Sequence, residues 1–165
     1  MLMFDASSIK DLIQNKSFVS KKISIIVSDW NSEITELLYD ASINTLLKYG
    51  VTHKHIKKQI VPGSMELILA SQLLLENNKT LDGIICLGCI IKGETDHDKY
   101  ISHAVTHGLV NVSLKYNKPV IFGLLTTNNK QQAFDRSGGK FGNKGEESAL
   151  ALLKMLHLID TISTK

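Results

Sequence analysis

The chain has 165 residues, of which 43% are hydrophobic and 21% charged, and its formal net charge is +3. This length suits one domain that buries a core without disulfides or metals, and the mild charge argues against a nucleic-acid partner. The sequence has no apolar run long enough to cross a membrane and no signal-peptide pattern, so we expect a cytoplasmic protein with no membrane partner.

Residues 1–20 show no sustained period, and we expect an N-terminal arm ahead of a single domain over residues 21–165. The apolar side chains of the arm, Phe18 among them, have no obvious place in a core. Apolar, β-branched strands then alternate with amphipathic helices. The predicted strands are Lys21–Val27, Val51–Val61, Gly83–Ile91 and VIFGLL after Pro119; the predicted helices are Ser32–Tyr49, Ser64–Glu76, Lys99–Tyr116, Asn129–Arg136 and one from near Glu146 past Leu158. Asn31 or Ser32 can cap the first helix, and Gly50 suits its end.

This alternation predicts a parallel sheet with helices on both faces, and near-continuous apolar strands fit burial on both sides. Right-handed crossovers then give a three-layer α/β/α sandwich around a four-stranded, parallel, doubly wound sheet. Ligands of such sheets bind outside the carboxyl ends of the strands. The candidate site is therefore built from four loops: SDWN, VPGS, KGETDH and the loop after GLL.

The two cysteines, Cys86 and Cys89, form a CxxC pattern inside the apolar run GIICLGCII. A CxxC pattern can be a redox pair, but this run predicts a buried strand. Residues three apart on a strand point to opposite faces of the sheet. We therefore expect two small core residues.

The first two loops carry an aromatic ring and a carboxylate. Trp30, the only tryptophan, follows the first strand, where its ring can stack on a heterocycle or simply pack on the helix below. Gly63 and Ser64 precede a helix, so free amides are expected there. Glu66 in the first turn is either a helix-start carboxylate or a group that holds ligand hydroxyls.

The third loop resembles a phosphate nest. Gly93, Glu94 and Thr95 place amides and a hydroxyl ahead of a helix. His97 adjoins them and is either a solvated side chain or a group that titrates near neutral pH in a reaction.

Two further patterns are incomplete as known motifs. His103 and His107 have a spacing that can chelate zinc, but Ala104 occupies the glutamate position of HExxH and no third ligand is evident, so we expect no metal site. Arg136 precedes the Gly-rich SGGKFGNKG, which lacks the Gly-Lys-Ser/Thr triplet of a nucleotide-binding P-loop. Its basic groups suit either a phosphate monoester or a solvated loop.

The strings VSDWN, VPGSMEL, CLGCIIKGETDHDKY, NVSLKYNKPVIFGLLTT and GGKFGNKGEES occur in the order and spacing of lumazine synthases, and this resemblance covers roughly residues 23–158. It implies a flavodoxin-like fold and a transferase of riboflavin biosynthesis. The enzyme would condense 5-amino-6-(D-ribitylamino)uracil with 3,4-dihydroxy-2-butanone 4-phosphate, releasing phosphate and water, with no cofactor. The alternative is a non-catalytic flavin-binding or shell-forming paralogue on the same fold.

The resemblance also implies roles for individual residues. Trp30 stacks on the pyrimidine, although phenylalanine is commoner there, and His97 is catalytic with Glu147 as the acid that orients it. Phe122 and Arg136 are contributed by a neighbouring subunit. The remaining implied contacts are Ser64, Met65, Glu66, Ile90, Ile91, Lys92 and Phe122 for the pyrimidine and ribityl groups, and Glu94, Thr95, Arg136 and Lys144 for phosphate.

For assembly, the resemblance implies a homo-oligomer built from pentamers, with sites at subunit interfaces, and association with riboflavin synthase. We expect the arm to pair with the sheet edge of a neighbour. The uninserted SGGKFGNKG loop favours a sixty-subunit icosahedral shell, whereas Gly139, at the threonine position of shell formers, leaves an isolated pentamer or decamer open.

Overall fold

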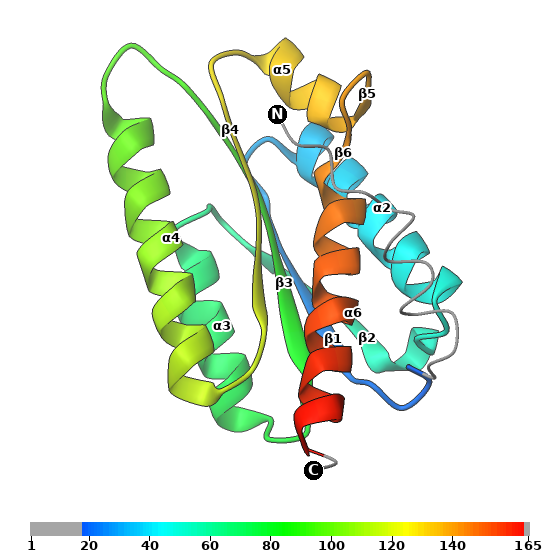
Figure 1. The fold of residues 1–165 in the computed structure, drawn as a ribbon. Coiled ribbons are helices and arrows are strands. Elements are labelled where there is room, and N and C mark those ends of the chain that lie inside the picture. Colours follow the sequence, from blue (N-terminus) through cyan, green and yellow to red (C-terminus); the bar gives the residue numbers. More distant parts are fainter. Residues whose placement is uncertain (1–17, 164–165) are drawn as a thin grey trace.

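The computed structural model describes residues 18–163, and a four-stranded parallel sheet forms its central layer (Figure 1). The strands are β1 (Ile23–Ser28), β2 (Ile56–Val61), β3 (Gly83–Ile91) and β4 (Val120–Thr127), in the order β2-β1-β3-β4. Every neighbouring pair is parallel. The predicted doubly wound, flavodoxin-like sheet is confirmed, whereas the predicted arm falls mostly on residues 1–17, outside the described residues.

Helices cover both faces of the sheet (Figure 1). On one side lie α2 (Ser32–Lys48) and α6 (Lys144–Ser163), and on the other α3 (Glu66–Asn77) and α4 (His97–Tyr116). All six residues of β1 are buried because alternate side chains enter the two cores: Ile25 and Val27 pack toward α2 and α6, and Ile26 toward α3 and α4. Phe18 is also buried, at 1% exposure, in the core on the α2 side. The expectation that Phe18 has no core position was therefore wrong.

One of the two element boundaries predicted near β2 differs in the structure. The second strand begins at Ile56, because His53–His55 form a short 3₁₀ helix, η1. The Thr52 hydroxyl donates to the Val19 carbonyl over 2.9 Å, and the His55 Nδ1 lies 2.9 Å from the same oxygen. These side-chain contacts join the segment before β2 to Val19. The predicted stop of the first helix at Gly50 is confirmed by a φ of +88°, which glycine adopts without strain.

The Gly-rich segment after β4 is an ordered hairpin instead of the loose loop that its composition predicts. The hairpin is formed by β5 (Ser137–Gly139) and β6 (Gly142–Asn143), and it follows α5 (Lys130–Arg136). Gly138 and Gly142 have φ values of +124° and +78°. The Asn143 amide donates to the carbonyls of Ser137 and Leu37 over 2.8 and 3.2 Å, which ties the hairpin to α2.

Within residues 18–163, no helix has the length and apolar character needed to cross a membrane.

Candidate active site

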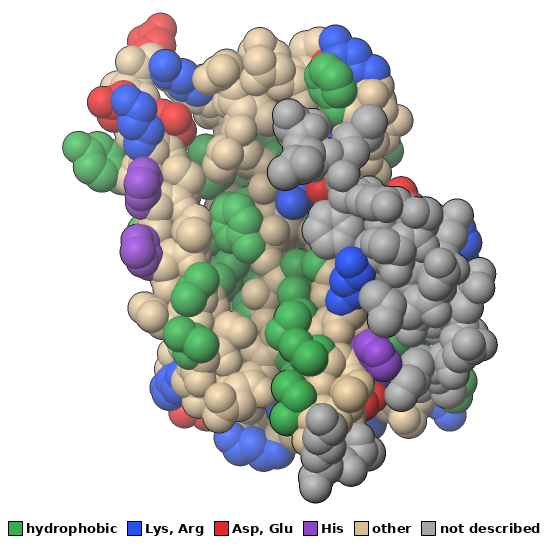
Figure 2. All heavy atoms as spheres, viewed as in Figure 1, with side chains coloured by type: hydrophobic (Ala, Val, Ile, Leu, Met, Phe, Trp, Pro, Cys, Tyr) green, Lys and Arg blue, Asp and Glu red, His purple; other side chains and the backbone are tan. Residues whose placement is uncertain are grey.

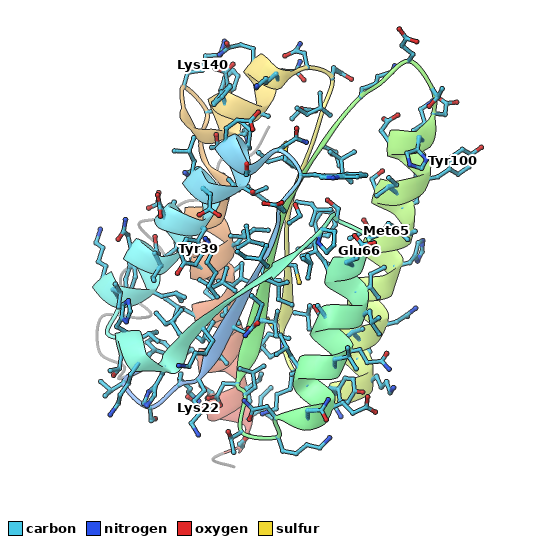
Figure 3. The ribbon with its side chains drawn as sticks, turned by 180° about the vertical axis from the view of Figure 1, so that it is seen from behind. Lys22, Tyr39, Met65, Glu66, Tyr100 and Lys140 are labelled. Atoms are coloured by element: carbon cyan, nitrogen blue, oxygen red, sulfur yellow. The ribbon has the colours of Figure 1, made fainter. Side chains whose placement is uncertain are left out.

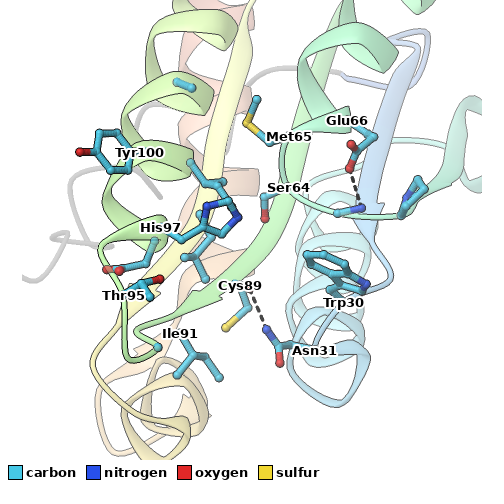
Figure 4. Close-up of a pocket in the computed structure, with 17 residues that line it drawn as sticks. Trp30, Asn31, Ser64, Met65, Glu66, Cys89, Ile91, Thr95, His97 and Tyr100 are labelled. Atoms are coloured by element: carbon cyan, nitrogen blue, oxygen red, sulfur yellow. Dashed lines mark hydrogen bonds between the residues drawn. The ribbon is translucent and has the colours of Figure 1, made fainter.

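A cavity of about 690 Å³ lies at the carboxyl ends of β1 and β3 (Figure 4). The chain runs from β1 outward to β2 and from β3 outward to β4, so the strand order reverses between these two strands. Such a switch point leaves a crevice in a doubly wound sheet. The loop after β1, the residues before α3, the end of β3 and the first turns of α4 form its walls.

One wall presents the aromatic ring of Trp30. Its backbone N–H donates to the Pro62 carbonyl over 3.1 Å, which joins the loop after β1 to the segment after β2. The ring lies beside Gly63, and 70% of the residue remains exposed. An aromatic surface backed on one side and open to a cavity can stack on a planar ligand.

The same wall carries a carboxylate and a hydroxyl at the start of α3. The N–H of Gly63 donates to Glu66 Oε2 over 2.9 Å, as Figure 4 shows, and Oε1 has no hydrogen-bond partner among the described residues. Glu66 is therefore both a helix-start residue and a cavity carboxylate, so the two interpretations of it are compatible. Ser64 lines the cavity while only 8% exposed. It precedes α3, which begins two residues later than predicted.

Thr95 and His97 form the opposite wall, with the imidazole directed into the cavity (Figure 4). The helix α4 begins at His97, two residues earlier than predicted, so the imidazole belongs to a helical turn and not to a loop. Asp98 follows it, and its Oδ1 is shielded from solvent without a hydrogen-bond partner among residues 18–163. Tyr100 stands at the rim, 75% exposed.

The end of β3 closes the cavity floor. The side-chain amide of Asn31 donates to the Cys89 carbonyl over 2.9 Å. Asn31, one of the two predicted candidates, occupies the N-cap position of α2 with a φ of +61°, but its side chain makes no capping hydrogen bond. The amide is used instead to join the loop after β1 to β3. This contact fixes the wall that bears Trp30 relative to the cavity floor.

Both cysteines are unpaired and buried, and they face opposite cores, as predicted. Burial raises the pKa of Cys86 to about 12, although the Ser71 hydroxyl opposes the shift. Burial, followed by the charge of Glu33, raises the pKa of Cys89 to about 11. Cys89 thus lines the cavity as a neutral thiol.

We expect the folded protein's Cys89 to react with a disulfide reagent at pH 8 about 100-fold more slowly than a free thiol, and Cys86 about 1,000-fold more slowly, because only the thiolate attacks. The protonated, buried thiols contribute to the stability of the folded state. This contribution is complete below about pH 9 and is lost as the pH rises through 11 to 12. A timed thiol titration in native buffer and in guanidinium measures the effect. Fast labelling of the native protein at pH 8 would contradict it.

A second group of charged residues lies at the end of α5 and the start of α6, on either side of the hairpin. The Arg136 guanidinium is 2.8 Å from the Glu147 carboxylate, and the Lys144 ammonium is 3.4 Å from it. None of the three lines the cavity. In Figure 3, Lys140 of the hairpin lies beyond the first turn of α2, whereas Tyr100, Met65 and Glu66 lie on the α3 and α4 side of the sheet.

The structure gathers eight of the fourteen predicted site residues around the cavity. They are Trp30, Ser64, Met65, Glu66, Ile90, Ile91, Thr95 and His97. Lys92, Glu94, Phe122, Arg136, Lys144 and Glu147 do not line it. Sequence reasoning missed four residues of α4 that line the cavity, namely Asp98, Tyr100, Ile101 and Ala104. A predicted helix that began at His97 would have placed His97, Ile101 and Ala104 on one face.

Among residues 18–163, no group of three or more histidines, cysteines or carboxylates is close enough to hold a metal ion. The cavity surface combines an aromatic ring, a carboxylate, a hydroxyl and an imidazole. These groups can stack a planar ring, bind hydroxyls and transfer protons.

Apolar side chains remain on the surface of the single chain. Figure 2 shows them along the face between α4 and α6, where β4 is an edge strand. Phe122 lies on this strand, half-buried. The large hydrophobic residues exposed on these two helices are Tyr100, Val110, Leu114, Met155, Leu158 and Ile162.

Comparisons with known proteins agree with one another. Residues 20–160 match the family model described as 6,7-dimethyl-8-ribityllumazine synthase. A protein of that name from Cytophaga hutchinsonii is 53% identical over 137 residues, covering 83% of this chain and 86% of its own. The protein of that name from Parabacteroides distasonis is 46% identical, and the alignment covers 82% of this chain and 84% of the relative. The one from Bacteroides fragilis is 44% identical, and the alignment covers 84% of this chain and 96% of the relative.

Proposed function

The chain belongs to the 6,7-dimethyl-8-ribityllumazine synthase family, and from this premise we propose how its residues carry out that reaction in riboflavin biosynthesis. The reaction condenses 5-amino-6-(D-ribitylamino)uracil with 3,4-dihydroxy-2-butanone 4-phosphate. The amine and ketone form an imine, phosphate leaves, the ring closes and water is lost. The site must therefore hold two reactants, bind phosphate and move protons.

The observation that carries the proposal is the arrangement of one cavity between Trp30 on one wall and His97 on the other. Trp30 stacks on the pyrimidine, and Glu66 with Ser64 binds the ribityl hydroxyls. Met65, Ile90 and Ile91 at the end of β3, and Lys92 directly after it contact the remainder of that substrate. Holding the reactants together is the largest catalytic term, because orientation alone can supply about 7–11 kcal/mol.

His97 is the group that moves protons. It lies in the first turn of α4, beside Thr95, with its imidazole open to the cavity. A positioned imidazole can protonate the leaving oxygen atoms and accept protons from the amine. The backbone amides of Gly93 and Glu94, together with Thr95, receive the phosphate end of the butanone substrate.

The remaining phosphate contacts come from a neighbouring subunit. Arg136, Lys144 and Phe122 do not line the cavity of their own chain, which supports a site completed across a subunit boundary. The exposed apolar face between α4 and α6 supports close packing of such subunits. We therefore propose a homo-oligomer built from pentamers. The short β5–β6 hairpin favours closure into a sixty-subunit shell, and light scattering distinguishes that shell from a pentamer or decamer.

We expect the purified protein to form the lumazine chromophore and release an equal amount of inorganic phosphate when both substrates are supplied with a chelator and no nucleotide. The reason is that proton transfer and phosphate departure need only the groups named above. Absorbance of the product and a phosphate assay measure the result. Activity that disappears with the chelator and returns with zinc would contradict this mechanism, and flavin binding without turnover would favour the non-catalytic alternative.

A further inference from the structure

The guanidinium of Arg136 is held inside its own chain where α5, the hairpin and α6 meet. Its Nη1 lies 2.8 Å from Oε1 of Glu147, and its Nη2 donates to Oε2 of Glu147 over 3.0 Å. Nη1 also donates to the backbone carbonyl of Phe141. The side chains of Arg136 and Glu147 are only 17% and 25% exposed, so solvent screens this ion pair incompletely.

These contacts leave one edge of the guanidinium open. The group has five N–H donors, one on Nε and two on each Nη atom. Glu147 faces the end between the two Nη atoms, and Phe141 accepts from Nη1. Within residues 18–163, Nε has no hydrogen-bond partner, and Nη2 has one N–H left. The Nε–Nη2 edge presents two parallel donors, which is the geometry that binds two phosphate oxygens at once.

The surroundings of this pair are fixed by further contacts. Lys144 and Glu147 lie three residues apart in the first turn of α6, and the Lys144 ammonium is 3.4 Å from Oε2 of Glu147. Asn143 accepts from the Gly145 N–H over 2.8 Å, which joins the hairpin to the start of α6. A Cβ at Gly145 would lie 1.9 Å from the Leu38 carbonyl, so this turn rests directly on the backbone of α2.

Glu147 remains ionised at neutral pH. Burial alone would raise its pKa, but the hydrogen bond and charge of Arg136, together with Lys144, outweigh burial and lower the pKa below its usual range. Arg136 and Lys144 contribute two positive charges and Glu147 one negative charge, so the cluster has a net charge of +1. Anion binding there depends on the orientation of the donors as well as on charge.

We propose that Glu147 is a positioning residue for phosphate binding: it holds Arg136 so that the Nε–Nη2 edge receives the phosphate of the butanone substrate. This inference rests on the proposed function and deepens it. It differs from the role that the family resemblance implies for Glu147, which is to orient His97. The contacts that Glu147 makes within the described residues are to Arg136 and Lys144, at 2.8 and 3.4 Å.

Removing the carboxylate of Glu147 has two opposing effects on phosphate binding. It removes a negative charge near the anion, which favours binding, and it frees the guanidinium to rotate, which weakens binding. The loss of orientation dominates because the phosphate approaches a different edge of Arg136 from the one that Glu147 occupies. A glutamine cannot replace the carboxylate, since its NH₂ group would face one of the Nη donors.

The test compares Glu147→Gln with Glu146→Gln, the exposed neighbour on the same helix. We expect Glu147→Gln to raise both the KM for the butanone phosphate and the inhibition constant of inorganic phosphate about tenfold. The KM for the pyrimidine should stay within about twofold, and Glu146→Gln should change none of the three constants. Glu147→Asp retains the charge but shortens the reach, and we expect the same selective rise.

An unchanged or lower inhibition constant of phosphate in Glu147→Gln would overturn the inference, as would an equal rise in both KM values. Light scattering of each variant identifies loss of assembly, and Glu147→Asp then provides the deciding measurement. The variant Arg136→Ala distinguishes an error in the positioning role of Glu147 from an error in the proposed function. If Arg136→Ala leaves phosphate inhibition unchanged, the proposed phosphate role of Arg136 is wrong; if only Glu147→Gln has no effect, the positioning role alone is wrong.

Discussion

Replacing Arg136 with alanine is expected to raise the KM for the butanone phosphate about 100- to 1,000-fold and the KM for the pyrimidine far less. A bidentate guanidinium–phosphate contact in a partly shielded site is worth about 3–4 kcal/mol, and each 1.4 kcal/mol is tenfold in affinity. Alanine also leaves the Glu147 carboxylate without its main partner and close to the anion. Steady-state kinetics with each substrate varied in turn measures the selectivity.

Lys140→Ala is the matched control for Arg136→Ala. Lys140 belongs to the same hairpin and has the same charge, but it is 66% exposed and lies 3.6 Å from Asp135. An exposed pair of this kind contributes little, so both KM values should remain within about twofold. An equal loss for both substrates in Arg136→Ala would indicate that Arg136 supports the hairpin structure instead of binding phosphate.

The location of Arg136 in a neighbouring subunit can be tested with the same variant. Subunits carrying Arg136→Ala and subunits carrying His97→Ala are each defective alone. If the site is shared, random co-assembly places an intact His97 opposite an intact Arg136 in about a quarter of the interfaces. Unfolding and refolding the two variants together should therefore restore about that share of activity. No recovery in a correctly assembled mixture would place both residues in one subunit's site.

Replacing His97 with alanine is expected to lower kcat by about 10²–10⁴-fold without abolishing turnover, which is the usual contribution of a general acid–base group. The reactants would still be held by Trp30, Glu66 and the phosphate contacts, so the orientation term survives. Single-turnover formation of the chromophore measures the chemical step directly. The KM values should change much less than kcat.

His103→Ala is the control for His97→Ala, because His103 lies on the same helix but is exposed and outside the cavity lining. It should retain wild-type kinetics. A His97→Ala variant with unchanged kcat across the pH range would remove this imidazole from the mechanism.

Periodicity in the sequence was a good guide to the sheet and a weaker guide to helix ends. The strand Gly83–Ile91 was predicted to the residue, because a continuous apolar run flanked by polar residues has clear limits. The starts of α3, α4 and α6 were each displaced by two residues, since the first turn of a helix has few intrahelical hydrogen bonds and little periodic signal. The displacement mattered most at His97, where a helical turn directs the imidazole.

By itself, the sequence determined the layered fold, the family resemblance, and the location of the cavity at the carboxyl ends of the strands. These features follow from hydrophobic period and rare local motifs, which are properties of short segments. The tertiary structure decided which distant residues meet. It joins Asn31 to Cys89, and Arg136 to Glu147 across the hairpin. It also separates the cluster of Arg136, Lys144 and Glu147 from the cavity of its own chain. Such contacts depend on the directions of the crossovers and on backbone turns at positive φ. A local sequence pattern does not show which distant residues these features bring together.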